Sequence, residues 1–334
     1  MRELPEMAGA LGLKPYAARQ LAGWLYGKMG RSFEEMTDLS KEARRLLAQR
    51  YSVSAVRTAD RLAAPDGTTK LLLEGAAGGR FECVLIPAEE GRTTACISTQ
   101  VGCAMGCSFC RTADMGLVRD LTLGEITGQL IELSRESPAP ITNLVFMGMG
   151  EPLNNMEAVL DAIEIFLDGG CFGLSKRRIT LSTSGLIPKL EEFARRADVK
   201  IAISLNATTD EVRDRIMPVN RQSPIAEIMR FAREYGASHR NRVTFEYVML
   251  RGVNDAREDA ARLAKLLGGI RAKVNLIPFN PYEGSPYDAP LAETVEWWSD
   301  FLRRAGLQAN VRASRGGEIL AACGQLASKA EARS

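Results

Sequence analysis

The chain has 334 residues, of which 46% are hydrophobic and 25% charged, and its formal net charge is +2. This composition is ordinary for a globular protein, and the length suggests about two domains or one large α/β domain with additions. The small net charge neither demands nor excludes a nucleic-acid partner.

The sequence contains no stretch that approaches the roughly 18 apolar residues of a membrane span. Its first residues, MRELPEMAGALG, have no apolar run of the kind found in a signal peptide. We therefore expect a cytoplasmic protein without a membrane partner. In that reducing compartment the seven cysteines are expected to be metal ligands, reactive thiols or core residues rather than disulfides.

Residues 1–52 have helical periodicity in LKPYAARQLAGWLYGKM and SKEARRLLAQRY, which predicts a small N-terminal helical domain. Residues 53–92 change to strand-like runs separated by a Pro-Asp-Gly turn, so we expect a short β meander that links to the core. Strands and helices then alternate over residues 93–306. Residues 307–334 hold a last strand, 308–314, and a C-terminal segment.

Six β/α units are predicted between residues 93 and 306. The expected strands are 94–99, 143–149, 178–183, 199–205, 242–250 and 272–279, and the expected helices are 122–135, 156–168, 187–196, 223–235, 255–267 and 291–305. Thr122 and Glu125 form a capping-box pattern, and Ser223 before Pro224 suggests an N-cap. The alternation predicts an α/β fold with a parallel sheet, either open or closed into a full or partial barrel.

Three cysteines are spaced C-x₃-C-x₂-C on the loop after the first of these strands: Cys103, Cys107 and Cys110. A structural zinc site would need a fourth ligand; Cys96 lies seven residues upstream, and the single histidine, His239, is distant in sequence. A cubane iron–sulfur cluster usually has four cysteine ligands, so three leave one iron open for a small molecule.

This spacing in a six-unit β/α chain, with Phe109 just before the last cysteine, resembles the radical S-adenosylmethionine (SAM) superfamily. The resemblance implies a partial (βα)6 TIM-like barrel and a [4Fe–4S] cluster held by Cys103, Cys107 and Cys110. It also implies that the open iron binds SAM, which is cleaved to a 5′-deoxyadenosyl radical.

Further stretches resemble the RlmN/Cfr family of RNA methyltransferases over nearly the whole chain. They are LYGKMGRSFEEMTDLSK at 25–41, CISTQVGCAMGCSFC at 96–110, GMGEPLNN at 148–155, SKRRITLSTSG at 175–185, NLIPFNP at 275–281 and AACGQL at 321–326. The resemblance implies that Cys323 carries a methyl group taken from one SAM and that Glu82 removes a ring proton. Cys96 then forms a transient disulfide with Cys323 that releases the product.

Each of these three residues has a simpler interpretation from its local sequence. Cys323 in AAC and Cys96 in a strand are also typical of buried core cysteines, and Glu82 could be a solvated surface acid. Cys83 and Cys171 match no catalytic position and are expected to be structural.

The resemblance also implies a SAM pocket built from residues that end predicted strands: Gly150, Glu151, Ser182, Ser204, Leu205, Asn206 and Asn280. Two positions depart from the family pattern. Asn206 stands where many relatives have histidine, which puts its side-chain contact in doubt. SRGGEIL at 314–320 replaces an acidic run, which we interpret as tolerated variation.

The expected activity is methylation of carbon 2 of adenine 2503 in 23S rRNA, and of adenine 37 in tRNA, with an external electron donor such as flavodoxin and a monomeric enzyme. The alternative is the Cfr branch, which methylates carbon 8 of the same rRNA base; Pro152 after GMGE favours carbon 2. A zinc-bound, non-catalytic RNA-binding protein is the alternative of a different class. Basic groups that could contact phosphate are Lys14, Arg19, Lys28, Arg31, Lys176–Arg178, Arg240, Arg242, Arg312 and Arg315.

Overall fold

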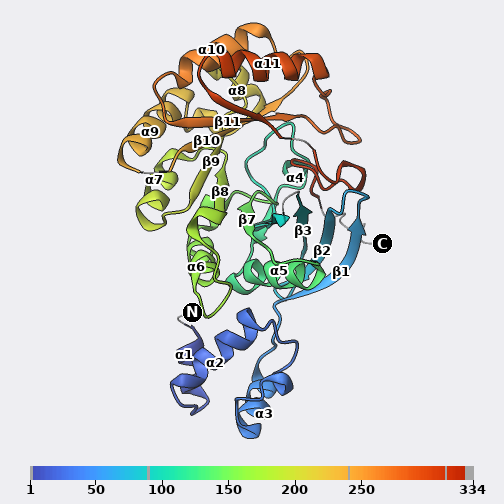
Figure 1. The fold of residues 1–334 in the computed structure, drawn as a ribbon. Helices are drawn as coiled ribbons and strands as arrows, with labels where there is room; N and C mark the ends of the chain where they lie inside the picture. The colour runs from blue at the N-terminus through green and yellow to red at the C-terminus, as the bar shows by residue number, and fades with distance from the viewer. Residues whose placement is uncertain (1–2, 89–90, 240, 313, 328–334) are drawn as a thin grey trace.

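The structure is a computed structural model that describes residues 3–88, 91–239, 241–312 and 314–327. Within these residues its centre is one ten-stranded sheet, in the order β1-β2-β3-β4-β7-β8-β9-β10-β11-β12. Figure 1 shows the sheet curving into an incomplete barrel, with helices on its outer face and the N-terminal helices beyond one end.

Seven neighbouring strands are parallel and form the open barrel. They are β4 (Thr93–Cys96), β7 (Asn143–Phe146), β8 (Ile179–Thr183), β9 (Lys200–Ser204), β10 (Val243–Met249), β11 (Ala272–Pro278) and β12 (Gln308–Val311). Within the described residues β12 pairs with β11 alone, so the barrel does not close onto β4.

Helices join these strands and cover the outer face, as the sequence predicts: α5 (Leu123–Glu136), α6 (Met156–Leu167), α7 (Ile187–Arg196), α9 (Ile225–Ser238), α10 (Arg257–Leu267) and α11 (Ala292–Arg304). Each buries an apolar stripe; in α7 it contains Ile187, Leu190 and Phe193. The capping box of α5 is confirmed, since Thr122 Oγ1 accepts from the Glu125 N–H at 3.3 Å while Glu125 Oε2 accepts from the Thr122 N–H at 2.9 Å. The partial (βα)6 barrel predicted from the sequence is confirmed.

The predicted start of α9 is wrong by one position, because Pro224 rather than Ser223 is the N-cap. The Pro224 carbonyl accepts from the Glu227 N–H at 3.0 Å, and the Ser223 hydroxyl instead accepts from the Ile187 N–H at the start of α7. The short helices α4 (Arg111–Asp114) and α8 (Asp210–Ile216) and the hairpin of β5 (Gln100–Gly102) and β6 (Leu117–Asp120) were not predicted. They are too short to show a hydrophobic period.

The meander extends the barrel sheet on the β4 side. Its strands β1 (Val56–Ala63), β2 (Thr69–Gly75) and β3 (Arg80–Pro87) are antiparallel, and β3 pairs antiparallel with β4. Leu72 pairs with Glu82, and Lys70 pairs with Val84. Lys70 and Glu82 are therefore diagonal neighbours on one face of the sheet.

The N-terminal residues fold around a small core of their own, which includes Leu21, Phe33, Met36 and Leu47. Its main helices are α1 (Glu3–Ala10), α2 (Tyr16–Ala22) and α3 (Lys41–Arg50), and the Ser40 hydroxyl caps α3. Arg135 of α5 donates to the Met29 carbonyl at 2.9 Å, which ties this unit to the barrel. No helix in the described part of the chain is long and apolar enough to span a membrane.

Candidate active site and metal centre

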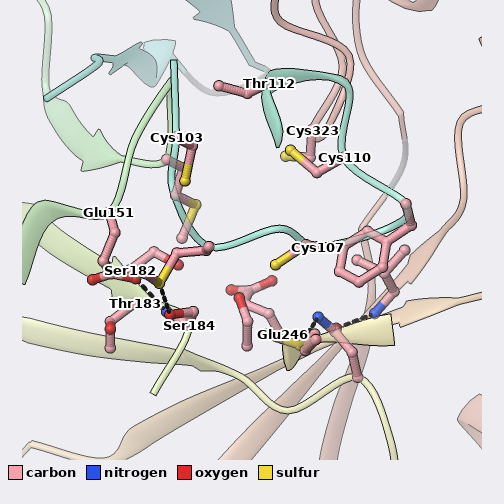
Figure 2. A pocket seen from close by; sticks show the side chains of 18 of the residues that line it. Cys103, Cys107, Cys110, Thr112, Glu151, Ser182, Thr183, Ser184, Glu246 and Cys323 are labelled. Carbon is pink, nitrogen blue, oxygen red and sulfur yellow. Dashed lines mark hydrogen bonds between the residues drawn. The ribbon is translucent and has the colours of Figure 1, made fainter. Parts of the chain in front are cut away.

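The loop that carries Cys103, Cys107 and Cys110 lies between β5 and α4, at the carboxyl end of the barrel strands, and all three cysteines line one pocket. Figure 2 shows them around a common space. The base of the loop is closed by the Cys103 N–H, which donates to the Gly116 carbonyl at 2.9 Å. Gly102 is required there, because its φ is +77° and a Cβ would lie 1.8 Å from the Gly116 oxygen.

Burial raises the pKa of all three thiols. The pKa of Cys103 rises to about 11, and the pKa values of Cys107 and Cys110 also rise, with the neighbouring thiolates adding to the effect at Cys107. Arg213 opposes the rise at Cys107 without cancelling it. Three thiols that line one pocket suit metal coordination, which stabilises the thiolate form. Because a cubane places each cysteine on its own iron, this donor set fits a [4Fe–4S] cluster with one open corner.

A closed zinc centre fits less well. Within the described ranges, no group of three or more His, Cys, Asp or Glu side chains could hold a single metal ion. The zinc alternative requires four such ligands in a tight tetrahedron.

Gly150 and Glu151 follow β7 and line the same pocket. Gly150 has φ +99°, and a Cβ would lie 2.6 Å from the Gln100 side chain and 2.9 Å from its backbone nitrogen. The buried Glu151 carboxylate accepts from the Ser184 N–H at 2.7 Å and the Leu153 N–H at 3.2 Å, while burial raises its pKa. A fixed carboxylate beside a close backbone approach is suited to an ammonium group.

Ser182, Ser204 and Asn206 also line this pocket from the ends of β8 and β9, whereas the Leu205 side chain is buried in the core. Asn206 has φ +55°, a conformation that asparagine tolerates better than most residues. Its Oδ1 accepts from the Val248 N–H at 2.8 Å. The amide therefore braces β9 against β10, and its free hydrogen-bonding capacity toward a ligand is small.

Cys323 lies between two pockets. One is the pocket of the three loop cysteines, and the other contains Cys96, Asn280 and Arg312. Gly324, the next residue, accepts from the Arg111 N–H at 2.8 Å, which places Cys323 beside the end of the cysteine loop. Figure 2 shows the Cys323 side chain near Cys110. The structure thus brings Cys323 into reach of both the loop cysteines and Cys96.

Arg312, which sequence reasoning grouped with possible phosphate ligands, lines both of these pockets. The Cys323 thiolate is the largest influence that raises the pKa of Arg312; burial opposes it, and Glu246 and Cys96 add to the rise. The pKa of the Cys96 thiol is raised to about 12, chiefly by burial; the Cys323 thiolate contributes to the rise and Arg312 opposes it. Arg312 is thus the cation that faces the two cysteines.

Glu82 is buried but does not share a pocket with Cys323. It lines a third pocket with Lys70 and Arg111. Its Oε1 lies 3.0 Å from Lys70 Nζ, and its Oε2 accepts from the Ala327 N–H at 2.9 Å. The C-terminal segment, residues 316–327, therefore lies between Glu82 and the pocket of the cysteine loop.

Two buried charged residues were not predicted: Glu246, which lines the pocket, and Arg213, which lies behind its wall. Arg213 on α8 donates to the carbonyls of Ser184 and Ser204 at 2.7 and 3.1 Å, and so ties the ends of β8 and β9 together. Glu246 lies in β10, whose residues are nearly all buried, so a period of two could not show which side chains face inward. Arg240, one of the basic residues named above, lies outside the described residues.

Comparisons with known proteins agree with this geometry. A family model of the radical SAM superfamily matches residues 97–264, and one of the ribosomal RNA large subunit methyltransferase N-terminal domain matches residues 1–53. The dual-specificity RNA methyltransferase RlmN of Paramagnetospirillum magneticum is 48% identical over 98% of this chain and 74% of its own length. That of Syntrophotalea carbinolica is 45% identical over 98% of this chain and 88% of its own.

The same relationship holds in three dimensions. A crystal structure of a radical SAM methyltransferase from Sphaerobacter thermophilus superposes with a TM-score of 0.93 at 42% identity, covering 97% of this chain and 96% of the other. The match includes both the N-terminal unit and the barrel with its cysteine loop. The chain therefore belongs to the RlmN family of radical SAM methyltransferases, whose cofactors are a [4Fe–4S] cluster and SAM.

Proposed function

We propose that this enzyme methylates carbon 2 of adenine 2503 in 23S rRNA and of adenine 37 in tRNA. The observation that carries the proposal is the position of Cys323 between the pocket of the cysteine loop and the pocket of Cys96. Carbon 2 of adenine lies between two ring nitrogens and is too electron-poor to attack a methyl donor itself. A carbon radical can add to such a position. A thiol that first takes the methyl group can present that carbon as a radical, and a second thiol can later release the product.

Cys103, Cys107 and Cys110 would hold the cluster, and Gly150 and Glu151 would receive the amino group of SAM. When bound, the cluster supplies the electron that cleaves SAM into a 5′-deoxyadenosyl radical. Ser182, Ser204 and Asn206 would complete the walls of the cofactor site, with the Leu205 backbone between them and Asn280 at the neighbouring pocket.

Cys323 acts as the first nucleophile in this scheme. A thiolate, not a thiol, accepts a methyl group, and the Arg312 guanidinium is the nearby cation that compensates its charge. The Cys323 methyl group would give up a hydrogen atom to the 5′-deoxyadenosyl radical, and its carbon would then add to carbon 2. Once the ring has lost its proton and returned one electron to the cluster, the RNA is linked to the protein through the Cys323 sulfur.

Cys96 completes the cycle. Its thiolate attacks the Cys323 sulfur, the bond between that sulfur and the methyl carbon breaks, and its electron pair stays with the product, which takes up a proton. Cys96 and Cys323 are left as a disulfide that thiol exchange reduces. Because burial raises the pKa of Cys96 to about 12, this attack needs Arg312 nearby.

Glu82 is proposed to accept the proton from carbon 2. In the structure the C-terminal segment separates it from Cys323, and the Ala327 N–H occupies one of its oxygens. The proposal therefore requires this segment to move when RNA binds, so that the Glu82 carboxylate faces the target base.

The other expectations complete the proposal. The chain would be divided into residues 1–52, 53–92, 93–306 and 307–334. Residues 1–52 would handle the RNA, and the match to an rRNA methyltransferase N-terminal domain supports that role. The enzyme would be a cytoplasmic monomer that acts on protein-free rRNA and on tRNA and receives electrons from a donor such as flavodoxin. The relatives' description as dual-specificity enzymes supports the two RNA classes.

Nucleoside mass spectrometry tests the proposal. Protein with a reconstituted cluster is incubated anaerobically with SAM, a reductant and a protein-free 23S rRNA fragment or tRNA, and the RNA is digested. A 2-methyladenosine peak is expected from both RNAs. An 8-methyladenosine peak would assign the chain to the alternative branch, and neither peak from cluster-loaded protein would contradict the proposal.

A further inference from the structure

Glu246 is a buried carboxylate at the pocket that the proposed scheme leaves without a role. In the sheet register Glu246 pairs with Ser204 on β9 and with Asn275 on β11. Register partners on parallel strands project to the same face, so these three polar side chains form a row across the inside of the barrel. Glu246 and Ser204 both line the pocket of the cysteine loop.

The Glu246 carboxylate is only half satisfied. Its Oε1 accepts from Asn275 Nδ2 at 2.9 Å, whereas Oε2 is buried and has no hydrogen-bond partner among the described residues. The whole residue is 4% exposed. A buried acceptor without a partner is costly and uncommon in a folded protein, so the oxygen needs a function.

The surroundings favour a ligand over a structural role. Arg312 has the larger electrostatic effect on Glu246 and Lys273 a smaller one, but within the described ranges neither forms an ion pair with it. The Arg312 Nη1 instead lies 3.2 Å from Met147 Sδ. Figure 2 shows Glu246 on the side of the pocket nearest Cys107 and across from Thr112. The unpartnered oxygen therefore belongs to a wall of the pocket expected to hold the cofactor.

An acceptor needs a donor, and SAM offers three kinds: the α-ammonium, the two ribose hydroxyls and the adenine amino group. The ammonium is assigned to the open iron and to Glu151, which Figure 2 shows on another side of the pocket. A carboxylate that accepts from ribose hydroxyls is a recurring solution in nucleotide sites. Ser204, in register with Glu246, is already expected at the cofactor.

We propose that Glu246 Oε2 accepts a hydrogen bond from a ribose hydroxyl of SAM, with Asn275 holding the carboxylate in position. This inference rests on the proposed function, because it assumes that the pocket holds SAM. It adds a specificity residue from β10 to a site that sequence motifs place at the ends of β7, β8, β9 and β11.

Binding of S-adenosylhomocysteine to cluster-loaded protein without reductant tests the inference without turnover. The parent ligand is compared with its 2′-deoxy, 3′-deoxy and N6-dimethyl forms, each against the native chain, Glu246→Ala and Glu246→Gln. Thr244→Val is the matched control, since Thr244 is buried on the same face of β10, two residues before Glu246, and is not among the pocket-lining residues.

We expect Glu246→Ala to weaken binding of the parent ligand by roughly 10- to 100-fold. Removal of one ribose hydroxyl should weaken binding to the native chain by a similar factor and have little further effect in Glu246→Ala. Glu246→Gln keeps the shape of the side chain, and its affinity for the parent ligand should lie between those of the native chain and Glu246→Ala. The comparison can therefore still be made if the alanine variant does not fold. Thr244→Val should bind like the native chain.

Two results would overturn the assignment to ribose. The loss of affinity caused by removing a ribose hydroxyl could be the same in the native chain and in both Glu246 variants. Alternatively, only the N6-dimethyl ligand could lose less affinity in the Glu246 variants than in the native chain. Either would leave the proposed function intact. If the native cluster-loaded chain binds no S-adenosylhomocysteine, the proposed function fails and this inference fails with it.

Discussion

Lys70 and Glu82 form a buried ion pair, with 3.0 Å between Lys70 Nζ and Glu82 Oε1, and both residues also hold the C-terminal segment. Lys70 Nζ donates to the Leu320 carbonyl at 3.2 Å, and Glu82 Oε2 accepts from the Ala327 N–H at 2.9 Å. The pair thus clamps both sides of the segment that carries Cys323. The residue proposed to accept the proton is also one that fixes the methyl-carrying cysteine.

Lys70→Met is expected to destabilise the protein by roughly 3 kcal/mol, because it leaves a buried carboxylate without its cation. Urea denaturation measures the change in the free energy of unfolding. Arg57→Met is the control: Arg57 forms an exposed pair with Glu74, so a change of at most about 0.5 kcal/mol is expected. Equal stability of the native chain and Lys70→Met would show that the buried pair contributes nothing.

Glu82→Gln should slow the removal of the ring proton by roughly 100-fold or more, the usual contribution of a general base. Methyl loading of Cys323 should proceed normally, since Glu82 does not share a pocket with it and a glutamine oxygen can still accept from the Ala327 N–H that holds the segment. Mass spectrometry of the protein measures the loading, and denaturing gels measure the RNA adduct, which should persist. Lys70→Met separates the two roles of Glu82, because it disturbs the attachment of the C-terminal segment but keeps the carboxylate that would accept the ring proton. A normal product rate in Glu82→Gln would remove Glu82 from the mechanism.

Cys96→Ala should trap the covalent RNA–protein adduct, because the second thiol of the pair is missing. Cys323→Ala should form no adduct and no product while retaining the visible absorption of the cluster. Cys83→Ala is the matched control, because Cys83 is a buried cysteine on β3 that lines none of the pockets described above. Normal turnover in Cys96→Ala without adduct would mean that Cys96 is only a core residue.

Release of the adduct should accelerate with rising pH in the native enzyme. The pKa of Cys96 is raised from an ordinary value of 9.0 to about 12, chiefly by burial, so the thiol is neutral at pH 7 and its thiolate fraction grows about tenfold per pH unit. Quenched-flow gels from pH 7 to pH 9 would follow the decay of the adduct. A decay rate independent of pH over this range would show that deprotonation of Cys96 does not limit release.

The barrel could be predicted well from the sequence because its strands and helices are long, and because their hydrophobic periods and capping residues lie within each element. The six core strands and their helices begin and end within a few residues of the predicted positions, and Thr122 shows its capping pattern directly. The positions of Glu82 and Arg312 could not be predicted in this way. Both depend on the path of the C-terminal segment across the barrel, which is set by scattered contacts such as the Thr112 hydroxyl to the Leu326 carbonyl at 2.6 Å, between residues 214 positions apart.

Arg213→Met is expected to destabilise the fold by roughly 3 kcal/mol and to weaken cofactor binding. Arg213 is fully buried and donates to the carbonyls of Leu205, Ser223, Ser184 and Ser204 and to the Asn220 side chain. Loss of the guanidinium leaves these acceptors without a donor. Ser184 would be released with them, and its N–H holds Glu151.

Urea denaturation and S-adenosylhomocysteine binding measure the two effects of Arg213→Met separately. Arg213→Lys keeps the charge but offers only three donors without the planar fork, so it should recover part of the stability and little of the affinity. Arg215→Met, on the exposed face of the same helix, should change neither quantity. If Arg213→Met lost stability but bound the ligand normally, the tie between β8 and β9 would not be what positions Glu151.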